Sequence, residues 1–264
     1  MEVLELNSLK NKIAIVTGAS RSTGIGTAIC RSLASQGADI FFTHWHPFDE
    51  TEGNGGEKEW PEQLCAELKS LGVRASHMEA DFSNPEISIK IMDQVEQTLG
   101  NASILINNAA YCVPTNYQNL SITSLDQHYV VNNRGTVLLS TEFARRFEKN
   151  YTKGTPGRII FMVSKGPDPD NLAYILTKGA LIGLIEPLSV GLAPLHITVN
   201  GFDPGPTDSG WITDEMKTHF LPMFPMGRIG LPEDAARGIS FLASDDSQWI
   251  TGQVIKSEGG FLGK

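Results

Sequence analysis

The glycine-rich stretch TGASRSTGIG, residues 17–26, places the strongest constraint on the fold. It follows a short β-branched run, Ile13–Val16, and precedes a segment, 27–36, in which apolar residues recur at helical spacing. This order predicts a strand, a glycine-rich turn and a helix. The backbone N–H groups of such a turn point at one place, and the positive end of the helix dipole reinforces them. The stretch therefore predicts a phosphate-binding site.

Apolar runs and amphipathic stretches alternate along the chain. Strands are predicted at 13–16, 40–43, 73–78, 104–106, 158–163, 197–201 and 253–255, and helices at 27–36, 61–71, 86–99, 124–149, 173–190 and 232–243. The alternation predicts an α/β Rossmann fold: a doubly wound parallel sheet of about seven strands with helices on both faces. We expect one domain, 1–264, with a polar, glycine-rich surface loop insertion at 46–60, which is either a lid or a plain insertion.

Composition excludes several classes of partner and site. The formal net charge of −9 argues against nucleic-acid binding, so any phosphate site must be local. Cys30, Cys65 and Cys112 form no CxxC pair, which predicts a reduced, cytoplasmic protein, and their apolar neighbours predict buried, unreactive thiols. Residues 1–7 lack the pattern of a signal peptide, and no apolar run approaches about 18 residues, so we expect no membrane segment. His44 and His46 lack a further fixed ligand, so no metal site is predicted.

Several short motifs occur in a specific order after the glycine turn: Asn107-Asn-Ala-Ala110, Tyr174-x3-Lys178, Pro204-Gly-Pro-Thr207, and a closing Thr251-Gly-Gln-Val with Glu258-Gly-Gly. With them the whole chain resembles the short-chain dehydrogenase/reductase (SDR) family, in particular its 3-oxoacyl-[acyl-carrier-protein] reductase-like members. The resemblance implies a homotetramer in which the helices at 124–149 and 173–190 pack between subunits, although their apolar faces fit an ordinary core equally well.

The chain departs from the family pattern at three places. Ser22 and Thr23 make the glycine turn two residues longer than usual, and Ala110 stands where glycine is usual. Ser164 precedes Tyr174 by ten residues, whereas about a dozen is usual in the family. We expect this shorter loop to alter a wall of the substrate pocket.

The resemblance implies a dinucleotide at the glycine turn, with Asp81 and Phe82 near the adenine, Asn108 near the adenosine ribose and Thr207 near the nicotinamide. Asp81 could instead cap a helix together with Ser83. The expected cofactor-binding residues are Gly18, Ser20, Arg21, Gly24, Ile25, Gly26, Thr43, His44, Asp81, Phe82, Asn108, Ala109, Tyr174, Lys178, Pro204, Gly205 and Thr207.

The end of the second strand favours NADP over NAD. An NAD site offers a carboxylate to the ribose hydroxyls at this point, and that carboxylate would repel a 2′-phosphate. Here the strand ends Thr43-His44-Trp45, and the first acid is Asp49. Arg21 could supply the positive partner, with hydrogen bonds from Thr43 and His44.

Tyr174 and Lys178 lie four residues apart on a predicted helix, so they share one face. A nearby ammonium and an oxidised nicotinamide both favour the phenolate, which makes Tyr174 a usable acid and base. By resemblance, Ser164 binds the substrate carbonyl, and Asn132 holds a water that links Lys178 to solvent; Asn133 is the alternative for that role.

We therefore predict an NADPH-dependent reductase that converts a ketone, with a 3-oxoacyl thioester as one candidate, into a secondary alcohol. The expected partner is a small carbonyl or alcohol substrate. Two alternatives stay open: an NAD-dependent alcohol dehydrogenase of the same fold, and a non-catalytic dinucleotide-sensing protein. The spacing of Tyr174 and Lys178 does not match the enoyl-reductase branch, in which the lysine follows at a wider interval.

Overall fold

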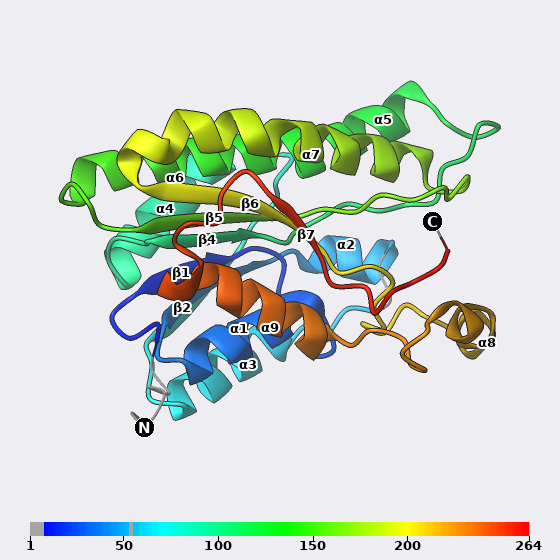
Figure 1. The fold of residues 1–264 in the computed structure, drawn as a ribbon, viewed down its shortest axis with the longest axis horizontal. Helices are drawn as coiled ribbons and strands as arrows, with labels where there is room; N and C mark the ends of the chain where they lie inside the picture. The colour runs from blue at the N-terminus through cyan, green and yellow to red at the C-terminus, as the bar shows by residue number, and fades with distance from the viewer. Residues whose placement is uncertain (1–7, 53–54, 264) are drawn as a thin grey trace.

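The computed structural model describes residues 8–52 and 55–263. Seven parallel strands form one sheet in the order β3-β2-β1-β4-β5-β6-β7 (Figure 1). The strands are β1 Ile13–Val16, β2 Asp39–His44, β3 Ala75–Glu79, β4 Ile104–Asn107, β5 Gly157–Met162, β6 Ile197–Asp203 and β7 Val254–Lys256. The order reverses between β1 and β4, and this reversal opens a crevice at the carboxyl ends of the strands.

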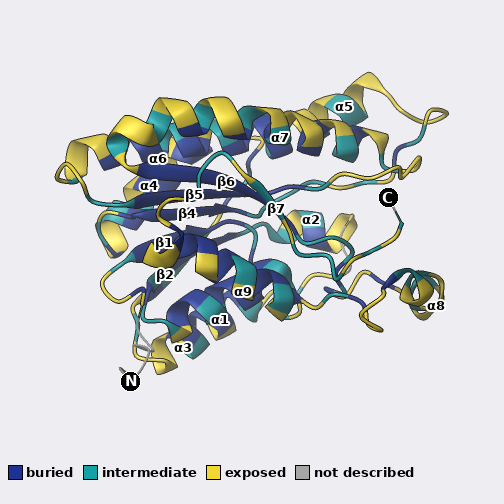
Figure 2. Cartoon of the chain, viewed as in Figure 1, coloured by how far each residue is buried: buried dark blue, intermediate teal, exposed yellow. Residues whose placement is uncertain are grey.

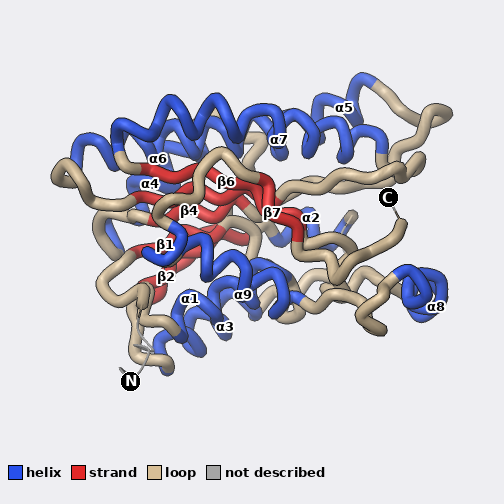
Figure 3. Tube along the Cα trace, in the orientation of Figure 1, coloured by secondary structure: helices blue, strands red, loops and turns tan. Residues whose placement is uncertain are grey.

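Helices cover both faces of the sheet (Figure 3). They are α1 Ile25–Ser35, α2 His46–Thr51, α3 Trp60–Ser70, α4 Ile87–Thr98, α5 Ile122–Tyr129, α6 Thr136–Asn150, α7 Leu172–Leu192, α8 Asp214–Phe220 and α9 Pro232–Ala243. One apolar core joins the sheet to α1, α3 and α9, and a second joins it to α4, α6 and α7. Strands β1, β4, β5 and β6 are buried along their whole length (Figure 2), as expected for a sheet covered on both faces.

The predicted fold class is confirmed, with single-domain architecture across the described residues. The expected absence of a signal peptide concerns residues 1–7, which lie outside them.

Two predicted elements are wrong in detail. The helix expected at 124–149 is α5 and α6 joined by a π-helical turn, Val130–Gly135. Hydrophobic spacing does not reveal such a turn because it adds only one residue per turn to a continuous coil. The segment 46–60 is not a plain loop: it opens with α2, whose Asp49 is only 7% exposed, while 53–54 lie outside the described residues. The short helix α8 was not expected.

Candidate active site

A cavity of about 1610 Å³ lies at the carboxyl ends of the strands. Ligand pockets commonly measure about 300–1,000 Å³, so this one has room for two molecules. Every cofactor-binding residue expected from the sequence lines it, and so do Ser164, Tyr174 and Lys178. Asn132 is absent from the lining within the described part of the chain. The site therefore gathers the expected residues with that one exception.

The glycine turn forms one end of the cavity, and its glycines are required by space. A Cβ at Gly26 would stand 2.2 Å from the carbonyl oxygen of Gly18, and one at Gly18, where φ is +76°, would stand 2.7 Å from Cα of Ala109. Helix α1 follows with Gly24 as its N-cap, with no acid in its first turn, and with no side-chain cap among the described residues. Its first N–H groups are therefore available to an anion, and the turn fits a dinucleotide pyrophosphate.

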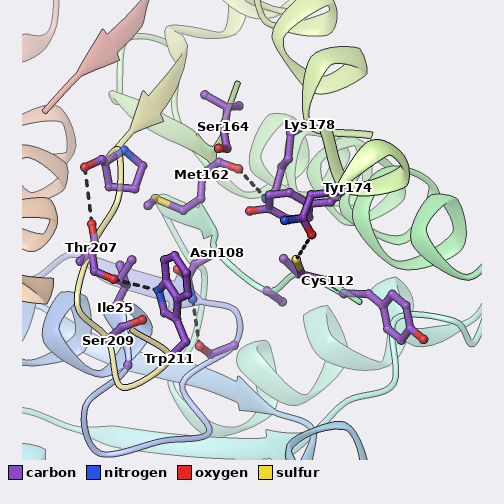
Figure 4. Close-up of a pocket in the computed structure, with 18 of the residues that line it drawn as sticks. Ile25, Asn108, Cys112, Met162, Ser164, Tyr174, Lys178, Thr207, Ser209 and Trp211 are labelled. Carbon is purple, nitrogen blue, oxygen red and sulfur yellow. Dashed lines mark hydrogen bonds between the residues drawn. The ribbon is translucent and has the colours of Figure 1, made fainter. Parts of the chain in front are cut away.

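The tyrosine and lysine line the cavity away from the glycine turn (Figure 4). Tyr174 lies in the first turn of α7, and Lys178 follows one turn later with its Nζ 5.5 Å from the centre of the tyrosine ring. The ammonium donates a hydrogen bond of 2.8 Å to the carbonyl of Met162, at the end of β5, and Ser164 comes two residues later. Strand β5 and helix α7 thus bring the three side chains into one cavity.

Burial dominates the electrostatics of Tyr174 and Lys178. It raises the pKa of Tyr174 well above its usual value, with smaller contributions from Cys112 and Asp203, so the phenol is protonated at neutral pH. Burial also lowers the pKa of Lys178 to about 8. The protonated phenol is the form that a general acid requires.

The chain matches the family model described as Enoyl-(Acyl carrier protein) reductase over residues 18–262. The chain belongs to the short-chain dehydrogenase/reductase family. It is 51% identical over 256 residues to the uncharacterized oxidoreductase YjdA of Bacillus subtilis, covering 96% of this chain and 98% of the relative. As an SDR, the protein is an oxidoreductase that binds a nicotinamide dinucleotide.

Two solved structures illustrate the range of cofactors among similar SDR proteins. One is a short-chain dehydrogenase from Burkholderia cenocepacia in complex with NADP, with 29% identity, a TM-score of 0.83, and coverage of 96% of this chain and 99% of that one. The other is a 7α-hydroxysteroid dehydrogenase with NADH and 7-oxo glycochenodeoxycholic acid, with 26% identity, a TM-score of 0.86, and coverage of 100% and 99%. Both fold like this SDR, and they hold different dinucleotides.

The longer glycine turn of this SDR reaches two other segments. Ser22 donates to the carboxylate of Glu57 from both its backbone N–H and its hydroxyl, each at 3.0 Å. Thr23 donates from its hydroxyl to the carbonyl of Ser209, at 3.4 Å. The extra residues therefore connect the turn to the 46–60 segment on one side and to the segment after β6 on the other.

Arg21 has an acidic neighbour that sequence reasoning did not pair with it. Its Nε lies 3.7 Å from Oδ1 of Asp49 in α2. Burial raises the pKa of Asp49, while a hydrogen bond from Ser20 and the charge of Arg21 oppose the rise. Thr43 accepts a hydrogen bond from the N–H of Gly18, at 3.3 Å. The first acid after β2 thus lies against the cation expected to meet a phosphate.

Asn132 lies behind the cavity. Its Oδ1 accepts from the N–H of Tyr111 at 2.7 Å, and its Nδ2 donates to the carbonyl of Tyr111 at 2.8 Å and to the hydroxyl of Thr177 at 3.0 Å. Asn133 makes one bond, to the carbonyl of Thr177 at 2.9 Å. The π-helical turn aims both amides inward. The Asn132 amide ties the segment after β4 to α7, so a relay water would have to bind another atom of this turn.

Asp81 was expected near the adenine or as a helix cap with Ser83, and all three cysteines were expected to be buried. Both carboxylate oxygens of Asp81 accept from Ser83, from its N–H and its hydroxyl, each at 2.8 Å, although α4 begins only at Ile87. Cys112 is exposed and lines the cavity, with its Sγ 3.7 Å from Oδ1 of Asn171, whereas Cys30 and Cys65 are buried. The interpretation of three buried thiols was therefore wrong for Cys112.

The aromatic wall of the cavity, which is formed by Trp211, Phe220 and Phe261, was not predicted from the sequence. The indole N–H of Trp211 donates to the carbonyl of Thr207 at 2.8 Å, and Phe220 and Phe261 lie edge to face with centres 6.2 Å apart. All three aromatic residues line the cavity, together with Met216 and Met223. The signal was available, because apolar side chains cluster in the segment directly after Pro204-Gly-Pro-Thr207.

Two further surveys cover the described residues only. No group of three or more His, Cys, Asp or Glu side chains in 8–52 and 55–263 could hold a metal ion. One segment, Leu172–Leu195, is long and apolar enough to cross a membrane by length and composition alone, with a mean hydropathy of 1.5. Helix α7, which supplies most of this segment, packs on the sheet and carries Lys178 into the cavity.

Proposed function

We propose that the protein is an NADPH-dependent reductase that converts a ketone into a secondary alcohol, with a 3-oxoacyl thioester as one candidate substrate. One observation carries the proposal: a protonated tyrosine, a buried lysine and a serine share a cavity with a glycine turn that fits a dinucleotide. The cavity has room for both ligands.

The bound dinucleotide supplies the hydride, and the side chains manage the carbonyl oxygen. Ser164 donates a hydrogen bond to that oxygen and orients the carbonyl. Tyr174 donates its proton to the same oxygen as negative charge develops there. The ammonium of Lys178 stabilises the phenolate that remains after this transfer. The aromatic wall of Trp211, Phe220 and Phe261 excludes water from the substrate.

The choice of NADPH rests on the end of β2, where Thr43-His44-Trp45 offers no carboxylate, and on the guanidinium of Arg21. One observation favours the alternative, an NAD-dependent alcohol dehydrogenase: Asp49 lies against Arg21 and compensates part of its charge. The planar fork of Arg21 can still bind a phosphate through its terminal nitrogens while its Nε faces Asp49.

We also propose that the protein is a cytoplasmic homotetramer. Free thiols among the described residues support a reducing compartment. Helix α7 exposes Leu176 and Val190, at 62% and 71%, beside glycines that leave open space, and such a face suits helix packing between subunits. Mass measurement in solution tests the assembly, and a monomer would contradict it.

The function is tested by titrating the protein with NADPH and NADH, followed by turnover against acetoacetyl thioesters, β-keto esters and simple cyclic ketones. We expect tighter binding of NADPH and reduction of at least one ketone. Tight binding without any turnover would indicate a dinucleotide sensor, and tighter binding of NADH would favour the alternative dehydrogenase.

A further inference from the structure

A chain of three side chains leads from the cavity to the surface at the end of β2. Nε2 of His44 lies 3.2 Å from Nδ1 of His77 in β3, and Nε2 of His77 lies 3.2 Å from a carboxylate oxygen of Glu62 in α3. His77 is itself held in place by stacking on Phe42, with ring centres 5.1 Å apart. The imidazole of His44 is thus fixed from behind by a relay that ends in a carboxylate.

The relay determines which nitrogen of His44 carries hydrogen. A carboxylate only accepts, so His77 donates to Glu62 from Nε2 and its Nδ1 becomes an acceptor. His44 must then donate from Nε2, which leaves its Nδ1 without hydrogen as long as the ring is neutral. That Nδ1 is buried and has no hydrogen-bond partner among the described residues. An unpaired buried nitrogen at this place invites a partner from a ligand.

His44 lies where a dinucleotide presents its adenosine ribose. In dinucleotide-binding folds, the residue that contacts the ribose 2′ position follows the glycine turn by about 20 residues, at the end of the second strand. His44 ends β2, and with Ser20 it lines both the main cavity and a smaller adjoining one of about 190 Å³. The smaller cavity is lined by Lys58 and also by the acidic residues Glu57 and Glu79, and it is large enough for a phosphate group, which would meet Lys58 and His44 there.

We propose that His44, positioned by His77 and Glu62, takes up a proton when the 2′-phosphate of NADPH binds, and that this proton uptake adds to the preference for NADPH that the guanidinium of Arg21 provides. Neutral His44 presents a lone pair, which accepts a hydrogen from a ribose hydroxyl but repels a phosphate oxygen. Protonated His44 donates to the phosphate from Nδ1 and to His77 from Nε2, and Glu62 stabilises the charge through the relay. This inference rests on the proposed NADPH preference.

The surroundings of His44 make proton uptake measurable. Burial lowers the pKa of His44 to about 4, with His77 and His46 adding to the effect and Glu62 opposing it, so the ring is neutral before the cofactor arrives. A phosphate carries up to about two negative charges, and each opposite charge at contact distance raises a pKa by about 1–3 units. Together they are sufficient to protonate the ring near pH 7. The other charged groups near this end of β2 are Arg21, Asp49, Glu57, Lys58 and Glu79.

The proposal is tested by calorimetry of NADPH and NADH binding at pH 7.5 in buffers of different ionisation enthalpy. We expect NADPH to take up about half to one proton per site more than NADH does. Between pH 6.5 and 8, the dissociation constant of NADPH should rise about three- to tenfold per pH unit while that of NADH stays flat, because about half to one proton is linked to binding. His44→Gln should abolish the additional uptake, which separates protonation of His44 from protonation of the phosphate itself.

Variants of His77 separate the relay from simple packing. His77→Phe keeps an aromatic ring against Phe42 but cannot accept from His44, and we expect NADPH affinity to fall about tenfold and proton uptake to fall by more than half. His77→Gln restores an acceptor and should recover most of both. Glu62→Gln should weaken NADPH binding by about threefold, whereas Glu59→Gln, an equal loss of charge on an exposed neighbour, should leave it unchanged. NADH affinity reports whether each variant is folded.

The outcomes distinguish this inference from the proposed function. NADPH preference with equal proton uptake by the wild type and His44→Gln would overturn the role of His44 and leave the reductase proposal intact. Preference for NADH at every pH from 6.5 to 8 would overturn both. If His44→Gln does not fold, the pH dependence of the wild type and the comparison of His77→Phe with His77→Gln still decide the matter.

Discussion

The two ends of the cavity are held by different kinds of interaction. The glycine turn follows the fully buried strand β1, beside the end of the fully buried β4, and is fixed by backbone fit, since Gly18 and Gly26 leave no room for a Cβ. The aromatic wall is carried mainly by the segment around α8, and every residue of α8 is exposed or half-buried. The buried apolar cluster of this segment is small and consists of Ile212, Phe224 and Ile229. A rigid glycine turn suits the dinucleotide, which is the same ligand in every turnover. The weakly supported wall can accept substitutions that alter substrate binding with little loss of stability.

The largest expected effect concerns the chemistry between the two ends. Tyr174→Phe removes the acid but keeps the ring, so kcat for ketone reduction should fall by about 10²–10⁴-fold. NADPH affinity should stay within about twofold, because the glycine turn is untouched. Steady-state kinetics and a fluorescence titration measure the two quantities. Wild-type turnover in this variant would remove Tyr174 from the mechanism.

A change at the rigid end should damage binding and stability together. Gly26→Ala places a Cβ 2.2 Å from the carbonyl oxygen of Gly18, and neither backbone can move cheaply. Overpacking of this kind costs about 1–3 kcal/mol of folding free energy, so the melting temperature should drop. The turn must shift to relieve the contact, which moves its N–H groups away from the pyrophosphate, so we also expect dinucleotide affinity to fall by about tenfold or more. If Gly26→Ala binds NADPH normally, the turn is not rigid.

The sequence predicted the rigid part of the molecule better than the contacts between distant segments. The sheet and the glycine turn were predictable because strands buried on both faces read as apolar runs, and a phosphate turn needs its glycines in a fixed order. Arg21 and Asp49 meet across 28 positions of chain, and no local pattern records such a pairing. His44 and His77 meet because β2 and β3 are neighbours in a particular register, which strand patterns alone do not specify.

Function-related residues were predictable where a motif fixes them and not where tertiary contacts do. Tyr174 and Lys178 are neighbours by helical geometry alone. Asn132 could be named from its motif, but its three bonds to Tyr111 and Thr177 depend on a π-helical turn that apolar spacing does not reveal. Cys112 looked like a core thiol because its neighbours are apolar, yet Cys112 lines the cavity together with Tyr111 and Pro114.

A change at the weakly supported end should separate substrate binding from stability. Trp211→Ala removes the indole from the aromatic wall, and we expect KM for a bulky ketone to rise about tenfold. NADPH affinity and the melting temperature should change much less, since Trp211 lies outside the apolar cores of the described residues that join the helices to the sheet. Trp211→Phe should recover part of the KM. Trp249→Ala removes a tryptophan that is 95% exposed and outside the cavity lining, and it is the matched control. A large loss of stability in Trp211→Ala would show that both ends are equally rigid.

The smallest effect expected is a pH dependence of kcat, which arises at Lys178 and Tyr174, between the glycine turn and the aromatic wall. Lys178 has its pKa lowered to about 8 by burial, and the pKa of Tyr174 is raised, so as pH increases the lysine loses its charge while the phenol keeps its proton. If the ammonium is needed to stabilise the phenolate left by proton transfer, kcat for reduction should fall about twofold between pH 7 and 8 and continue to fall above that. Lys178→Arg keeps its charge throughout this range, so whatever activity it retains should be flat. A flat profile in the wild type would mean that the lysine only positions Tyr174, and that the dinucleotide end, rather than α7, supplies the positive charge beside the phenol.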